Sequence, residues 1–116
     1  MSNNKVIKVA VLTPGSPEFV WRNLTSNLKT LQTLVGGLIE RVPVPETEDD
    51  ASIYVNEEGK LDNLPVSAIW WFENKPYDLL RGTIIVCGQD ENGEDADLEP
   101  KLLERVRQFV TPLSQK

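Results

Sequence analysis

KVIKVAVL, residues 5–12, is apolar apart from its two lysines and is rich in β-branched residues. Such residues favour an extended backbone, and the turn signal Thr13-Pro14-Gly15 ends the run. Because nearly every position is apolar, we expect a strand in the interior of a sheet, with both of its faces covered. GTIIVCG, residues 82–88, has the same character between two glycines and predicts a second buried strand.

Two helices are predicted from apolar residues that recur at helical spacing. The first begins at an N-cap supplied by Thr25 or Ser26 and ends at Gly36-Gly37, because glycine readily takes the left-handed conformation of a helix C-terminus. The second runs from about Asp97, its expected N-cap, to Val110. The predicted buried residues of the two helices are Leu24, Leu28, Leu31, Leu34 and Val35, then Leu102, Leu103, Val106, Phe109 and Val110.

Shorter strands are predicted where proline, glycine or acidic residues interrupt the chain. A tight turn is expected at Asn56–Gly59 with a positive φ at Gly59, while residues 46–50 form an acidic loop and residues 64–76 an irregular segment. The short strands are residues 18–23, 38–44 and 52–56. This order predicts an α+β fold, with a mixed, mostly antiparallel sheet of about four to five strands and two helices packed on one face.

The totals predict one soluble domain over residues 1–116, with 40% apolar and 26% charged residues. Cys87 is the single cysteine and lies in an apolar run, so we expect a buried thiol in a reducing compartment. The first residues lack the apolar stretch of a signal peptide. We therefore expect a cytoplasmic protein that is not bound to a membrane.

The charge of the chain argues against general nucleic-acid binding. Eighteen acidic residues against twelve basic ones give a formal charge of −6. Phosphate backbones are bound by clustered lysine and arginine, and the sequence has no such cluster. A DNA mimic would need a denser acidic surface, whereas a charge of this size is typical of a soluble small domain.

The sequence offers little for catalysis or metal binding. It contains no histidine and one cysteine, which excludes the usual zinc sites and the usual nucleophile–base pairs. The acidic loop Asp90–Asp95 has its glycine at the wrong position for an EF-hand and is expected to be a solvated turn. We expect a protein that is not an enzyme and that has no cofactor and no metal site.

An aromatic and basic segment is the best candidate for binding. Residues 70–77 hold four of the eight aromatic residues of the chain. Aromatic faces stack on bases or fill protein interfaces, and lysine or arginine pairs with phosphates. The segment can thus be core packing, a protein interface or a small-ligand pocket. The candidate ligand-binding residues here are Trp70, Trp71, Lys75, Tyr77 and Arg81.

Three spaced motifs resemble a known family. LQTLVGGLIE (residues 31–40) is similar to an LQ-x-x-VGG-x-IE signature, NEEGKL (residues 56–61) with Leu64-Pro65 matches its second part, and GTIIVCG (residues 82–88) its third. Together they resemble small proteins of bacteriophages, plasmids and mobile elements that are known as a domain of unknown function. The resemblance implies no catalytic residues. We add Asn56 to the candidate ligand-binding residues.

Two functions remain as expectations. The resemblance implies a non-catalytic phage or mobile-element accessory protein that binds and neutralises or modulates a host component. The alternative is a nucleotide-sequestering protein that counters bacterial immune signalling through the aromatic and basic side chains. The expected partner is a host protein or a small nucleotide signal. A homo-oligomer is also compatible with a small sheet, which can pair its edges or faces.

Overall fold

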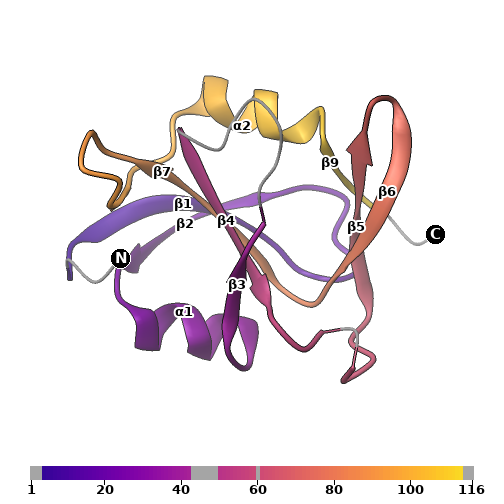
Figure 1. The fold of residues 1–116 in the computed structure, drawn as a ribbon. Coiled ribbons are helices and arrows are strands. Elements are labelled where there is room, and N and C mark those ends of the chain that lie inside the picture. The colour runs from indigo at the N-terminus through magenta and orange to yellow at the C-terminus, as the bar shows by residue number, and fades with distance from the viewer. Residues whose placement is uncertain (1–3, 43–49, 60, 114–116) are drawn as a thin grey trace.

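The computed structural model describes residues 4–42, 50–59 and 61–113, which form nine strands and two helices (Figure 1). The α+β class is confirmed, whereas the expected number of strands was too low. In chain order the elements are β1 Val6–Leu12, β2 Val20–Thr25, α1 Leu28–Val35, β3 Ile39–Arg41, β4 Ala51–Asn56, β5 Val66–Phe72, β6 Lys75–Arg81, β7 Ile84–Gln89, β8 Asp95–Ala96, α2 Pro100–Arg107 and β9 Val110–Pro112. Within the described residues, neither helix has the length and apolar character needed to cross a membrane.

The larger sheet has six strands in the order β2-β1-β7-β4-β3, with β8 paired to β7 beside this path. Every strand pair in the described part of the chain is antiparallel. The two apolar runs become β1 and β7, which are neighbours in the sheet and pair Val11 with Ile85. Their interior position agrees with the prediction from their composition, because strands covered on both faces need apolar residues at successive positions.

The two helices cover opposite faces of this sheet, so the prediction that both pack on one face was wrong (Figure 1). Successive side chains of a strand point to opposite faces. Val9 and Val11 of β1 accordingly pack in the cluster that contains α1, whereas Ala10 and Leu12 pack in the cluster that contains α2. The apolar residues at the successive positions 9–12 of β1 therefore require a covering layer on each side of the sheet.

The second sheet has three strands in the order β6-β5-β9 and contains the segment that was predicted to be irregular. Strands β5 and β6 form a hairpin whose turn residues Glu73 and Asn74 have φ of 51° and 63°. Positive φ at both positions suits the twist of a two-residue hairpin turn. Trp70 pairs with Asp78 and Trp71 pairs with Pro76, so Tyr77 is an extra residue at which the alternation of β6 is broken. This bulge explains why the sequence lacks a period-two pattern.

The ends of the helices differ from the predicted ones. Asn27, not Thr25 or Ser26, caps α1, since its side chain accepts a hydrogen bond from the Thr30 amide at 2.8 Å. Gly36 ends α1 in the predicted left-handed conformation, with φ of 81°. Helix α2 starts only at Pro100 and ends at Arg107, so Val110 belongs to β9 instead.

Asp97 does not cap α2. Its Oδ1 atom accepts a hydrogen bond of 2.8 Å from the amide of Lys8 in β1, and Glu99 takes the N-cap position without a side-chain hydrogen bond. Of the residues expected to be buried by the two helices, Leu28 is exposed, while Leu31, Val35, Leu103 and Val106 are buried. The carboxylate of Asp97 thus joins the segment before α2 to β1.

The turn after β4 is confirmed, but its backbone differs from the prediction. The amide of Gly59 donates to the carbonyl of Asn56 at 3.2 Å, as a tight turn requires. The positive φ of this connection belongs to Asn63, at 53°, and not to Gly59. The predicted acidic loop at residues 46–50 lies outside the described residues except for Asp50, and so does the end of the predicted strand at residues 38–44.

Candidate functional site

The aromatic residues of the hairpin divide between the core and the surface. Trp70 packs against the cluster that contains α2. The Tyr77 ring lies edge-on to Trp70, with centroids 4.9 Å apart, and 5.9 Å from the ring of Phe72. Tyr77 is 63% exposed and Phe72 is 43% exposed. These two side chains form an exposed aromatic pair, which we call the hairpin surface.

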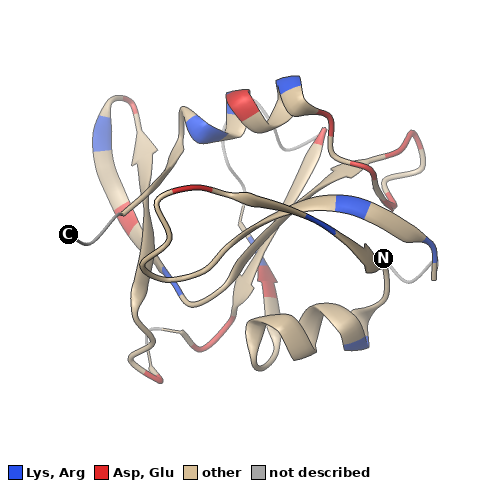
Figure 2. Cartoon of the chain, turned by 180° about the vertical axis from the view of Figure 1, so that it is seen from behind, with Lys and Arg blue, Asp and Glu red and all other residues tan. Residues whose placement is uncertain are grey.

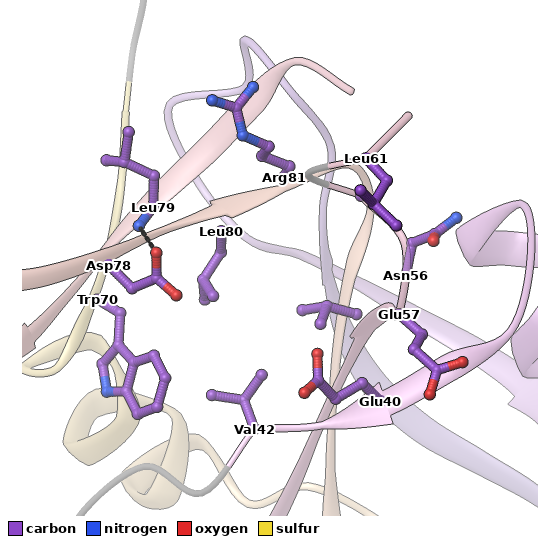
Figure 3. Close-up of a pocket in the computed structure, with 12 residues that line it drawn as sticks. Glu40, Val42, Asn56, Glu57, Leu61, Trp70, Asp78, Leu79, Leu80 and Arg81 are labelled. Carbon is purple, nitrogen blue, oxygen red and sulfur yellow. Dashed lines mark hydrogen bonds between the residues drawn. The ribbon is translucent and has the colours of Figure 1, made fainter. Parts of the chain in front are cut away.

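A cavity of about 310 Å³ lies beside this hairpin, between the two sheets (Figure 3). Strands β3 and β4 of the larger sheet supply one wall, and β5 and β6 supply the other. Three buried aliphatic side chains and a half-buried indole line its interior: Val42, Val55, Leu80 and Trp70. The cavity thus has an apolar interior that opens to solvent.

Three carboxylates and one guanidinium surround this interior. Figure 3 shows the carboxylates of Glu40 and Asp78 on opposite walls and Glu57 directed away from the interior. Asp78 accepts a hydrogen bond of 2.8 Å from the amide of Leu79. Arg81 also points away from Trp70, and its Nη1 atom donates to the carbonyl of Leu64 at 2.9 Å. The mouth of the cavity is therefore predominantly acidic.

The structure brings together three of the six predicted binding residues. Asn56, Trp70 and Arg81 line the cavity. Trp71 instead lines a separate hollow with residues of the β5–β6 turn and of the segment after α2. Lys75 begins β6 and is exposed, outside the lining of either space. Trp70 and Trp71 are successive residues of β5, and successive side chains of a strand point to opposite faces.

Asn56 has a structural role in addition to its place in the cavity wall. It is 7% exposed, its Nδ2 atom donates to the carbonyl of Val35 at 3.1 Å, and its Oδ1 atom accepts from the amide of Glu58 at 2.7 Å. These bonds hold the end of α1 and the turn after β4 together. The amide group is therefore engaged within the protein rather than presented to a ligand.

Sequence reasoning missed Glu40 and Asp78, which determine the charge of the cavity. Each is a single acidic residue in a short strand, next to residues of other character. Only the packing of the two sheets brings them together. A period-two pattern in β6 would have indicated which face Asp78 shares, but the bulge removes that signal.

A separate polar group is buried beneath α1. The Tyr54 hydroxyl donates to Asp95 Oδ1 at 2.8 Å, and Cys87 lies in the same layer with no exposed surface. Burial raises the pKa of the Tyr54 phenol and of the Cys87 thiol above their ordinary values. A buried thiol with a raised pKa is a poor nucleophile. The buried residues Tyr54, Asp95 and Cys87 therefore contribute to the structure rather than to a reaction.

Charges elsewhere are mixed rather than segregated. Basic and acidic residues are interspersed along β6 and along α2 (Figure 2). In residues 4–42, 50–59 and 61–113, no group of three or more aspartate, glutamate or cysteine side chains could hold a metal ion. At the cavity, by contrast, three of the four charged side chains that line it are acidic.

Residues 7–111 match a family model described as a domain of unknown function, DUF3846. The chain belongs to this family. The match confirms the expected resemblance to a domain of unknown function and spans the strands that line the cavity. Neither the curated proteins nor the solved structures contain a match to the chain.

Proposed function

We propose that this member of the family is a non-catalytic, cytoplasmic accessory protein of a phage or mobile element, which binds a host protein and neutralises or modulates it. The observation that carries the proposal is the hairpin surface, where Tyr77 is 63% exposed beside Phe72. Large aromatic side chains are enriched at the energetic centres of protein interfaces. Their exposure next to a cavity provides both an anchor and a recess for a partner.

The available side chains favour binding over catalysis. The sequence has no histidine, and its single thiol is buried with a raised pKa. General acid–base chemistry near neutral pH relies most often on histidine, and nucleophilic catalysis by cysteine needs an accessible thiolate. The carboxylates around the cavity are thus better explained by recognition than by a reaction.

A nucleotide ligand is the alternative, and one observation favours it: Trp70 and Arg81 line the same cavity. Phosphates, however, would meet the carboxylates of Glu40 and Asp78, while Arg81 is directed toward Leu64. Like charges in close proximity are mutually destabilising. The charge of the cavity therefore supports a protein partner more strongly than a nucleotide.

Affinity capture from bacterial lysates with matched variants tests the proposal. Tyr77→Ala should abolish the capture of a specific protein, because an aromatic anchor contributes about 2 kcal/mol or more to an interface. Trp21→Ala is the control, since Trp21 is a partly exposed aromatic residue on β2. Capture that depends on Trp21 and not on Tyr77 would contradict the assignment of the hairpin surface.

A thermal-shift screen with cyclic and ADP-ribose-type nucleotides tests the alternative on the same preparation. A ligand at a hundred times its dissociation constant stabilises a protein by about 2.7 kcal/mol. We expect no shift of the unfolding midpoint with any nucleotide. A clear shift that Arg81→Ala removes would replace the proposed protein partner with a nucleotide.

A further inference from the structure

The interior of the cavity suits the hydrocarbon part of a side chain. Val42, Val55 and Leu80 are 5–6% exposed, and all three line the cavity. The volume of about 310 Å³ is at the lower end of the range of ligand pockets, which is about 300–1,000 Å³. Long basic side chains cover apolar surface with their methylene groups and keep the charged end near polar groups.

The two carboxylates that face each other across the cavity select a positive charge. Glu40 comes from β3 in the larger sheet and Asp78 from β6 in the smaller one, and Figure 3 shows both directed at the space between them. Among the described residues, Glu40 has no ion-pair partner. Hydrogen bonds between a cation and carboxylates are stronger than those between neutral groups, especially in a partly desolvated recess.

Trp70 adds an aromatic surface beside these carboxylates. Its indole lines the cavity, and Tyr77 of the hairpin surface contacts it at a centroid distance of 4.9 Å. A guanidinium or ammonium group near an indole face gains a cation–π attraction, and guanidinium also stacks on aromatic rings. The cavity and the hairpin surface are thus continuous through one ring contact.

Other ligand classes fit this arrangement poorly. A metal ion needs converging ligands, and the described residues contain no group of three that could hold one. A phosphate or carboxylate would be repelled by Glu40 and Asp78. A purely apolar ligand would displace water from the two carboxylates without offering them a hydrogen bond.

We infer that the cavity between the two sheets binds an arginine or lysine side chain of the partner protein that docks on the hairpin surface. This inference rests on the proposed function and names the chemistry that its interface recognises. The methylene groups contact Val42, Val55 and Leu80, and the charged end lies between the carboxylates of Glu40 and Asp78 beside Trp70.

A titration followed by proton–nitrogen NMR spectra tests the inference with defined probes. The probe is the capped tripeptide acetyl-Leu-Arg-Leu-amide, and its control contains citrulline, which has the shape of arginine without the charge. We expect saturable shifts at the Trp70 indole and at the amides of Glu40 and Asp78. The citrulline peptide should bind about tenfold more weakly, as expected for the loss of one charge-assisted interaction.

Isosteric variants locate the charges that matter. Asp78→Asn keeps an oxygen that can accept from the Leu79 amide, and Glu40→Gln keeps the side-chain length. The double variant should lower the affinity for the arginine peptide about tenfold or more and bind both peptides alike. Glu91→Gln, in the exposed loop between β7 and β8, is the control and should leave the affinity unchanged.

The outcomes separate this inference from the proposed function. Equal binding of the arginine and citrulline peptides to the unmodified protein would overturn the inference, whatever the stability of the variants. So would capture of a Tyr77-dependent partner that the double variant retains in full, although the proposed function would stand. Agmatine that binds as tightly as the tripeptide would replace the partner side chain with a free amine. Arginine selectivity without any Tyr77-dependent partner would support the cavity's preference for cations and contradict the hairpin docking surface.

Discussion

Tyr54, Asp95 and Cys87 bring titratable groups into the layer between the larger sheet and α1. Burial disfavours the charged forms of the phenol and the thiol, and Asp95 beside them adds to that effect, so both pKa values are raised. The fold therefore prefers the neutral forms. These residues make the stability of the protein sensitive to alkaline rather than to neutral conditions.

The sign of this dependence follows from the raised pKa values. The neutral side chains of Cys87 and Tyr54 make their full contribution to the free energy of unfolding below their ordinary pKa values of 9.0 and 10.0, respectively. It is lost as the pH rises above these values, because the unfolded chain then releases protons that the folded chain retains. Urea unfolding should show a lower free energy of unfolding at about pH 10.5 than at about pH 8.

Tyr54→Phe provides the control for this prediction. It removes the phenol and its hydrogen bond to Asp95, which costs about 1–2 kcal/mol near neutral pH. The alkaline decline should become less steep, while the part that belongs to Cys87 remains. Tyr77→Phe, at an exposed tyrosine, should leave both the stability and its pH dependence nearly unchanged. An equally steep decline in the Tyr54 variant would assign the effect to other groups.

Single residues could be predicted where the local chain determines them. Cys87 lies in an apolar run and is buried, and Gly36 follows an apolar stripe and takes the left-handed conformation. Asp97 was assigned wrongly, because its carboxylate binds the amide of Lys8 at the other end of the chain. Local propensity contains no information about such a distant donor.

At the level of elements, the packing of β7 against the segment that follows β8 depends on the absence of a side chain at Gly88 of β7. A Cβ atom there would lie 2.3 Å from the backbone carbonyl oxygen of Asp97, which cannot move without shifting the chain. Gly88→Ala should therefore reduce the free energy of unfolding by more than about 2 kcal/mol, measured by urea denaturation.

Gly36→Ala is the matched comparison within the same protein. Gly36 has φ of 81°, but a Cβ atom at this position meets no atom within 4 Å. Its cost is therefore conformational and should be about 1 kcal/mol. A cost at Gly88 that does not exceed the cost at Gly36 would contradict the close contact with Asp97.

The elements that the sequence predicted share a clear period or an unbroken apolar run. Strands β1 and β7 and helix α1 were found near their observed positions for this reason. The β5–β6 hairpin was missed because its bulge breaks the alternation of side chains. Strands β8 and β9 have two and three residues, too few to produce a pattern.

At the scale of the whole molecule, the candidate site exists only because two sheets meet. Trp70 and Arg81 were identified from their residue types, since aromatic and basic groups suit binding. Glu40 and Asp78 could not be identified in this way, because nothing in the sequence indicates that β3 and β6 face the same cavity. One of the three interpretations of the segment, a small-ligand pocket for a nucleotide, implied a site for an anion, whereas the packed sheets form an acidic cavity.

Val55→Ile tests whether the cavity between the sheets is unfilled and whether it binds the arginine side chain of the peptide. Val55 is buried in β4 and lines the cavity, and the added methyl group keeps the β-branched shape that strands favour. We expect the free energy of unfolding to change by less than about 1 kcal/mol, because the methyl group enters vacant volume rather than a packed core. We also expect binding of the arginine tripeptide to weaken, since the methyl group occupies the volume of its methylene groups. Urea denaturation and the NMR titration measure the two effects separately. A loss of several kcal/mol would mean that the volume beside Val55 is already filled, and unchanged peptide binding with unchanged stability would place the cation outside the cavity.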